Sequence, residues 1–131
     1  MSQKEINITD LDLASLQQVK SQIEEEVSHL TQSYSKLKGV QSRFKDCSES
    51  VESLKAEKPD GKLSDVEKVI VDVGTGYYVE KSLGDATKFY NNKVDYVKKN
   101  METLEKTITD KQSTLRAIIG VMQEKLQKEQ K

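Results

Sequence analysis

The sequence has few of the residues that end helices or build compact cores. Among 131 residues it holds one proline, Pro59, and no tryptophan. Because proline breaks the interior of a helix, the stretches on both sides of Pro59 are free to form long helices. Hydrophobic residues make up 34% of the chain and charged residues 33%. This balance favours exposed helices with narrow apolar seams over a compact globule.

Side chains that carry chemistry are also scarce. Cys47 is the single cysteine, which excludes an internal disulfide or a cysteine cluster. His29 is the single histidine, and no second histidine or cysteine stands at ligand spacing from it, so we interpret it as a solvated helical residue. With a single histidine, the sequence also gives no sign of a Ser/His/Asp catalytic triad. We therefore expect no enzyme activity, no metal and no cofactor.

Strong charge and long apolar runs are absent as well. The net charge of −1 and the pI near 5.9 give no reason to expect binding to nucleic acid. No apolar run approaches the roughly 20 residues that span a bilayer. The first ten residues, MSQKEINITD, lack the basic-then-apolar pattern of a signal peptide. We expect a soluble protein of the cytoplasm, with the nucleus as a second location.

Apolar residues recur every seven positions in two separate stretches, which indicates two coiled-coil arms. The first series is Leu16, Ile23, Leu30, Leu37, Phe44 and Val51. The second series is Val94, Met101, Ile108, Leu115 and Met122, with a companion column of Tyr90, Val97, Leu104, Lys111, Ile118 and Lys125. The companion column of the first arm divides into Val19, Val40, Cys47 and Leu54 on one side and Val27 and Tyr34 on the other.

The two arms match in length. The first is predicted over 9–57, with Thr9 as its N-cap, and the second over 84–131, opened by Gly84 and by Asp85 as a cap or first-turn acid. Each would extend about 70 Å at 1.5 Å per residue. Residues 10–57 hold six Lys/Arg and nine Asp/Glu, and residues 84–131 hold ten and seven. Opposite net charges favour antiparallel pairing within the chain, and pairing between chains is the alternative.

Between the arms, residues 58–83 are predicted to form a linker and a β-hairpin, with strands at about 66–73 and 77–81. Valine, isoleucine and tyrosine alternate there with period two. Gly74-Thr75-Gly76 reads as a tight turn, and it lacks the lysine and longer glycine pattern of a phosphate loop. The fold class is therefore mainly α: one elongated module, a long antiparallel two-helix coiled-coil hairpin with a small β-hairpin at its apex.

A lone hairpin has open strand edges and is marginal in water. We expect it to join hairpins of other chains in a multichain β-barrel. The predicted oligomer interface consists of Val69, Ile70, Val71, Val73, Tyr77, Tyr78 and Val79.

In a self-paired hairpin both termini lie at the end opposite the strands. Apolar residues there exceed what a two-column seam requires, which indicates a weak, adaptable binding surface. The alternative is that these apolar residues pack against one another and only keep the helix ends from fraying. The predicted tip consists of Leu11, Leu13, Leu16, Ile119, Val121, Met122 and Leu126.

Two stretches resemble the alpha-class subunits of the prefoldin family. They are INITDLDLASLQQVKSQIEEEV at residues 6–27 and GKLSDVEKVIVDVGTGYYVEKSLGDATKFY at residues 61–90, of which VDVGTGYYVEK is the most specific part. In one respect the chain departs from the family pattern. Lys58-Pro59-Asp60-Gly61 leads straight into Lys62-Leu63, where alpha-class members carry a further apolar strand pair.

The resemblance implies a hexamer of two alpha-class and four beta-class subunits. Their hairpins would form a double β-barrel with the coiled coils hanging from it. It further implies binding of unfolded proteins, such as actin and tubulin, at the tips of the arms, and transfer to the cytosolic chaperonin without nucleotide. The missing strand pair implies a subunit with altered assembly. A structural or adaptor coiled coil that docks one defined partner is the alternative function; such a protein has no need of an aggregation-prone β apex.

Overall fold

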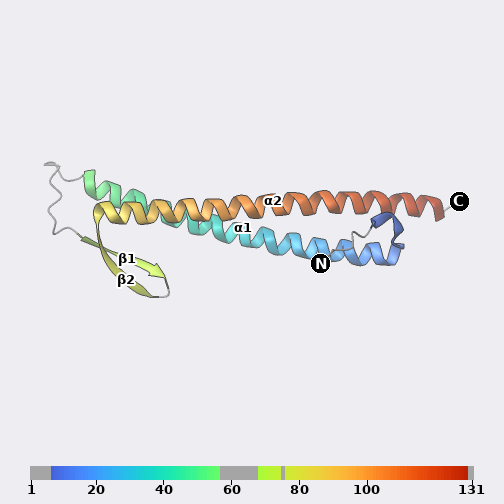
Figure 1. Ribbon diagram of the computed structural model, residues 1–131, viewed down its shortest axis with the longest axis horizontal. Coiled ribbons are helices and arrows are strands. Elements are labelled where there is room, and N and C mark those ends of the chain that lie inside the picture. Colours follow the sequence, from blue (N-terminus) through green and yellow to red (C-terminus); the bar gives the residue numbers. More distant parts are fainter. Residues whose placement is uncertain (1–6, 57–67, 75, 130–131) are drawn as a thin grey trace. The chain divides into compact units, whose positions relative to one another are not determined.

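The computed structural model of the chain describes residues 7–56, 68–74 and 76–129. Figure 1 shows two long helices and one β-hairpin, which confirms the predicted mainly α fold class. In chain order the elements are the 3-10 turn η1 (Ile8–Asp10), α1 (Leu13–Ala56), β1 (Lys68–Gly74), β2 (Tyr77–Ser82) and α2 (Leu83–Glu129). The predicted helix stop at Lys58-Pro59-Asp60-Gly61 and the junction with Lys62-Leu63 lie outside the described residues.

Helix α1 begins later than the sequence predicts. Thr9 lies in η1, where Asn7 Oδ1 accepts a hydrogen bond from the Thr9 backbone N–H at 3.1 Å. Asp12 caps α1, because its Oδ1 accepts from the Ser15 N–H at 2.7 Å. This hydrogen bond from the Ser15 backbone lowers the pKa of Asp12. The predicted N-cap at Thr9 is therefore wrong, since Thr9 belongs to the separate turn η1, which Asn7 caps.

Helix α2 begins directly after β2. The Ser82 Oγ accepts a hydrogen bond from the Asp85 N–H at 3.1 Å, so Ser82 is the cap. Asp85 stands in the first turn, where a negative charge meets the positive end of the helix dipole. The second of the two predicted roles for Asp85 is confirmed.

The structure divides into two compact units: a terminal unit of Met1–Tyr34 with Thr103–Lys131, and a central unit of Ser35–Glu102. Within each unit a segment of α1 packs along a segment of α2 (Figure 1). Glu26 and Lys111 form an ion pair in the terminal unit, and Ser48 and Asn91 share a hydrogen bond in the central unit. The predicted pairing of the arms within one chain is confirmed.

The seven-residue series form the buried sides of both helices. Leu16 and Ile118 have no exposed surface in the terminal unit, and Val51 and Val97 are each 5% exposed in the central unit. The remaining members of both series are buried or half-buried. Leu54, which was predicted to lie in a buried column, is instead 43% exposed. None of the helices in the described ranges has an apolar stretch that could cross a membrane.

Strands β1 and β2 pair antiparallel, with Val71 opposite Val79 and Asp72 opposite Tyr78. The register shifts at Val73, between Asp72 and Gly74, which is the signature of a β-bulge. Gly74 and Gly76 have φ values of 121° and 80°, a backbone region that favours glycine. Thr75, the middle of the predicted turn, lies outside the described residues.

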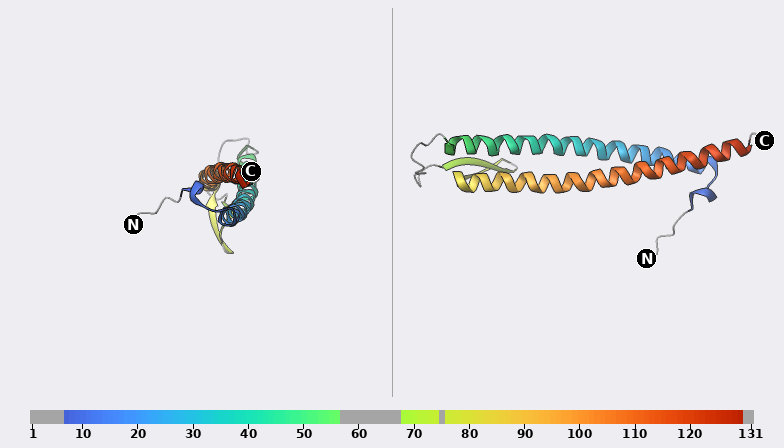
Figure 2. Two further views of the ribbon diagram at one scale, coloured as in Figure 1. Left: turned by 90° about the vertical axis from the view of Figure 1, so that its right-hand side faces the viewer. Right: turned by 90° about the horizontal axis from the view of Figure 1, so that it is seen from above.

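The hairpin lies beside the C-terminal part of α1 and the N-terminal part of α2. Figure 1 shows it beside the helices, and the right-hand view of Figure 2 shows it between them. Val71 joins the strands to the helices in one buried cluster with Val51, Leu83 and Ala86. The core of the central unit is therefore built from residues of α1, β1 and α2.

Candidate functional site

Large apolar side chains stand exposed on the hairpin. Ile70, Tyr77 and Tyr78 are 70%, 71% and 66% exposed, whereas side chains of this size are usually covered in a folded protein. Two valines beside them are exposed by more than a third of their surface. We call this set the hairpin surface: Ile70, Val73, Tyr77, Tyr78 and Val79. In the described part of the chain, β1 and β2 pair only with each other, so their outer backbone edges are open.

Two residues of the predicted interface lie elsewhere. Val71 has no exposed surface, because Val51, Leu83 and Ala86 surround it. Val69 is half-buried and packs against the same cluster. Val71 therefore belongs to the core of this chain, and it could touch another chain only if the central unit opened. The sequence pattern placed apolar residues on both strand faces and did not show which face the helices cover.

The predicted tip residues gather in the terminal unit. Leu16 is fully buried, and Leu126, 48% exposed, is the most accessible of them. The others are half-buried: Leu11, Leu13, Ile119, Val121 and Met122. Figure 2 shows the first turns of α1 and the last turns of α2 at the same end of this unit. The structure thus brings the predicted tip residues into one unit but exposes only part of their apolar surface.

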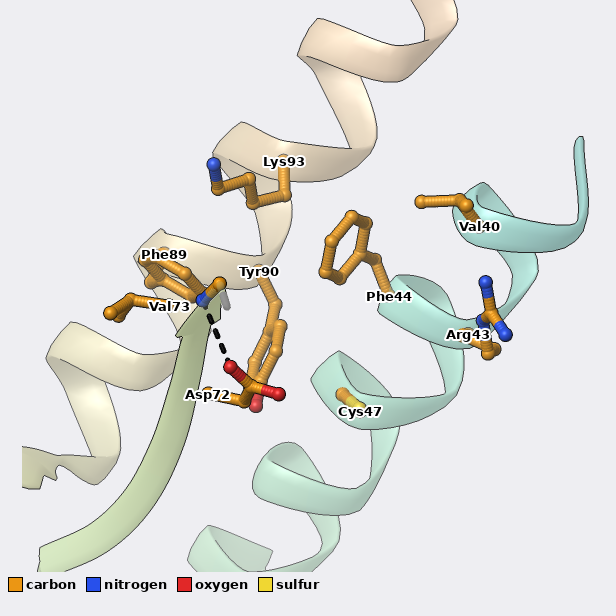
Figure 3. Close-up of a pocket in the computed structure, with 10 residues that line it drawn as sticks. Val40, Arg43, Phe44, Cys47, Asp72, Val73, Phe89, Tyr90 and Lys93 are labelled. Atoms are coloured by element: carbon orange, nitrogen blue, oxygen red, sulfur yellow. Dashed lines mark hydrogen bonds between the residues drawn. The ribbon is translucent and has the colours of Figure 1, made fainter. Parts of the chain in front are cut away.

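A cavity of about 420 Å³ lies in the central unit between α1, β1 and α2 (Figure 3). Phe44 and Tyr90 meet at its centre with ring centroids 6.2 Å apart, and Phe89 packs edge-on against Tyr90 at 5.3 Å. We call this cavity the aromatic pocket. Its lining consists of Val40, Arg43, Phe44, Cys47, Asp72, Val73, Gly74, Phe89, Tyr90 and Lys93.

Charged groups surround the aromatic rings of this pocket. The ammonium groups of Lys81 and Lys93 lie 5.4 and 5.6 Å from the centre of the Phe89 ring. Asp72 Oδ1 accepts a hydrogen bond from the Gly74 N–H at 2.9 Å. Burial raises the pKa of the Tyr90 phenol, and the neighbouring Cys47 thiol and Asp72 carboxylate raise it further. Tyr90 therefore stays protonated at neutral pH and presents an uncharged ring.

The sequence did not predict this pocket. Phe44, Cys47 and Tyr90 read there as seam residues, and all three are indeed half-buried. The pocket forms because β1 lies beside the three aromatic residues that α1 and α2 bring together. The concentration of aromatic residues at 44, 89 and 90, in a chain that is only 5% aromatic, was the available signal.

The described residues contain no group of three or more His, Cys, Asp or Glu side chains placed to hold a metal ion. His29 is exposed on α1, 3.7 Å from Glu25 of the same helix. Cys47 is a free, half-buried thiol within the aromatic pocket. What stands out chemically is apolar surface suited to binding.

Known proteins resemble this chain over most of its length. The family model for prefoldin subunits matches residues 23–128. The chain is 39% identical to prefoldin subunit 5 of Homo sapiens, over 93% of this chain and 88% of that protein. It is 34% identical to the probable prefoldin subunit 5 of Schizosaccharomyces pombe, over 93% and 90% of the two chains. For the probable prefoldin subunit 5 of Dictyostelium discoideum the identity is 31%, over 95% and 86%.

The alignment with the human relative also shows that this chain is shorter inside the matched region. It extends over 136 residues, whereas 93% of the 131 residues here is about 122, so about 14 residues of the relative have no counterpart. Two strands and a tight turn need about this many residues. The shortfall agrees in size with the strand pair that the sequence pattern lacks. With its paired helices, its β-hairpin and these relatives, the chain belongs to the prefoldin subunit family.

Proposed function

We propose that this chain is a subunit of a hexameric, ATP-independent co-chaperone that captures unfolded proteins and delivers them to the cytosolic chaperonin. Its partners are other prefoldin subunits of the alpha and beta classes, and its clients include actin- and tubulin-like chains. It acts by binding, without catalysis and without a cofactor, in the cytoplasm. Membership in the prefoldin subunit family supports the co-chaperone role and the assembly with other prefoldin subunits.

The observation that carries the proposal is the hairpin surface. Ile70, Tyr77 and Tyr78 expose most of their apolar area, next to strand edges with unpaired backbone groups. Contiguous exposed apolar area beside open strand edges marks a surface that another protein chain covers. Strands of neighbouring subunits cover both the side chains and the edges when they continue the sheet into a β-barrel.

Clients bind at the terminal unit. Leu126 is half exposed, and Ile119, Val121 and Met122 beside it are half-buried. Partly exposed apolar groups hold an unfolded chain weakly, and methionine adapts to varied side chains. Several subunits that each contribute one weak contact reach useful affinity together, because the contacts act at high effective concentration.

The experiment is aggregation suppression by the complex reconstituted with its partner subunits, with chemically denatured actin as client. The test variant replaces Ile119, Val121 and Met122 by serine, and a matched control replaces the exposed Gln123, Glu124 and Gln127 by serine. We expect weaker suppression from the test variant at equal assembly, and wild-type suppression from the control. Equal suppression by both variants would place client binding on other surfaces. A wild-type complex that suppresses nothing would overturn the proposed function.

A further inference from the structure

The aromatic pocket is separate from the terminal unit and has an apolar floor. Val40, Phe44 and Tyr90 supply apolar surface from α1 and α2, and Val73 supplies it from β1. At about 420 Å³ the cavity falls in the range of ligand sites and has room for one large side chain with its neighbours. Burial raises the pKa of the Tyr90 phenol, so Tyr90 stays uncharged and its ring contributes apolar surface. A large apolar side chain of another protein could therefore fill this cavity, which no side chain in the described part of this protein fills.

The rim of the pocket is cationic. Figure 3 shows Arg43 on α1 and Lys93 on α2, on the two sides of Phe44 and Tyr90. Within the described ranges Arg43 makes no ion pair. Lys93 and Lys81 approach the same Phe89 ring, so this ring has two ammonium groups beside it. An anionic group at the rim would be attracted by all three cations.

The pocket holds one negative group, and it is already engaged. Asp72 lies at the turn end of β1, where its carboxylate accepts the Gly74 N–H at 2.9 Å. The lining then carries two positive charges against one, and Lys81 beside it adds a third. The local charge at the rim therefore remains positive.

The positive charge is local and does not extend over the unit. Residues 35–102 contain 13 Lys/Arg and 12 Asp/Glu, close to neutrality. A nucleic acid or a lipid surface needs an extended basic face to gain binding energy. A short acidic segment needs only the rim. Tyr96, which is 65% exposed and one turn beyond Lys93 on α2, extends the apolar contact for such a segment.

From this geometry we propose that the aromatic pocket docks an acidic peptide segment of a partner protein, with one large apolar side chain in the cavity and flanking carboxylates at Arg43 and Lys93. The site shares Val73 with the hairpin surface but is otherwise lined by other residues, none of them in the predicted tip, and it does not depend on the chaperone function.

The test uses the full chain, labelled with ¹⁵N, and three capped pentapeptides. The probe is Asp-Glu-Phe-Glu-Asp, and the controls are Asp-Glu-Ala-Glu-Asp and Lys-Lys-Phe-Lys-Lys. We expect the probe to shift the amide resonances of Gly74 and Lys93 saturably, and both controls to bind at least tenfold more weakly. Absence of saturable shifts with the probe, or equal binding of all three peptides, overturns the proposal.

Charge reversal supplies the second arm. In Arg43→Glu with Lys93→Glu, affinity for the probe should fall at least tenfold. The matched control, Lys38→Glu with Lys98→Glu, makes the same charge change at exposed positions on the same helices and should bind within twofold of wild type. If the reversed variant loses helicity, Arg43→Gln with Lys93→Gln replaces it. Equal loss in test and control variants, or sedimentation with phosphatidylserine vesicles that depends on Arg43 and Lys93, would also overturn a peptide site.

Discussion

The hydroxyl of Ser48 on α1 donates a 2.8 Å hydrogen bond to Oδ1 of Asn91 on α2, 43 residues away in the sequence. Ser48 is 8% exposed and lies beside the aromatic pocket, one position after Cys47. This part-buried hydrogen bond between the two helices forms with good geometry in only one alignment of the helices. It therefore favours the observed register over neighbouring ones.

The first prediction concerns this pair. Ser48→Ala should lower the free energy of unfolding by about 0.5–1.5 kcal/mol, because it removes one part-buried hydrogen bond. Urea unfolding of Ser48→Ala, Asn91→Ala and the double variant measures the interaction as a double-mutant cycle. The sum of the two single-variant losses of unfolding free energy should exceed the loss in the double variant. Simple additivity would show that the hydrogen bond contributes nothing to stability.

The second prediction concerns the core of the central unit. Val71→Ala removes two methyl groups from a fully buried site and should cost about 2 kcal/mol of unfolding free energy. Ile70→Ala, the next residue on the same strand, removes a side chain that is 70% exposed and should cost far less. Urea unfolding of the isolated chain compares the two. Similar losses at both positions would contradict the burial of Val71 inside its own chain.

The third prediction is a pH dependence in the terminal unit. The hydrogen bond from Lys111 lowers the pKa of Glu26 below its usual 4.5. A carboxylate whose pKa is lower in the folded than in the unfolded chain stabilises the fold above the unfolded value, and this contribution is lost as pH falls through the folded value. Glu26→Gln should therefore melt below wild type at pH 7, and the difference should shrink steadily below pH 4.5.

Thermal melts followed by circular dichroism from pH 7 to pH 3 measure this difference. Glu25→Gln, one residue earlier on the exposed side of α1, serves as the control and should stay close to wild type at pH 7. A constant gap between Glu26→Gln and wild type across the pH range would show that the lost stability does not come from the ion pair.

The fourth prediction separates the observed cap of α1 from the one expected from the sequence. Asp12→Ala removes the acceptor of the Ser15 N–H and should reduce helicity and the melting midpoint. Asp12→Asn keeps an acceptor at the same place and should recover most of the loss. Thr9→Ala should change little, because Thr9 stands outside α1. A larger effect of Thr9→Ala than of Asp12→Ala would restore Thr9 as the cap.

Periodic features were predictable from the sequence because they repeat. Seven-residue spacing identified the buried sides of both helices, and period-two alternation with Gly74 and Gly76 identified the hairpin. Seven-residue spacing placed Lys111 in the companion column of the second arm. Its partner Glu26 became visible only once the register of the two helices was known, since 85 residues separate them.

Features that depend on packing were not predictable in the same way. Val71 and Val79 are opposite each other on the paired strands, yet the first is fully buried and the second is 43% exposed. Alternation states which residues share a face, but the burial of each also depends on where the helices end. The aromatic pocket needs α1, α2 and β1 together, so no local pattern describes it.

The central claim is that the hairpin surface joins this chain to other prefoldin subunits. The most direct measurement is native mass spectrometry of the chain coexpressed with its alpha- and beta-class partners, for wild type and for Tyr78→Asp. A carboxylate at this 66% exposed position leaves the isolated chain folded but is costly once a partner strand covers it. We predict a six-subunit mass for wild type, and free Tyr78→Asp chain with unchanged helicity. A wild-type chain that stays monomeric beside its partners, or a Tyr78→Asp variant that assembles as wild type does, would contradict the claim.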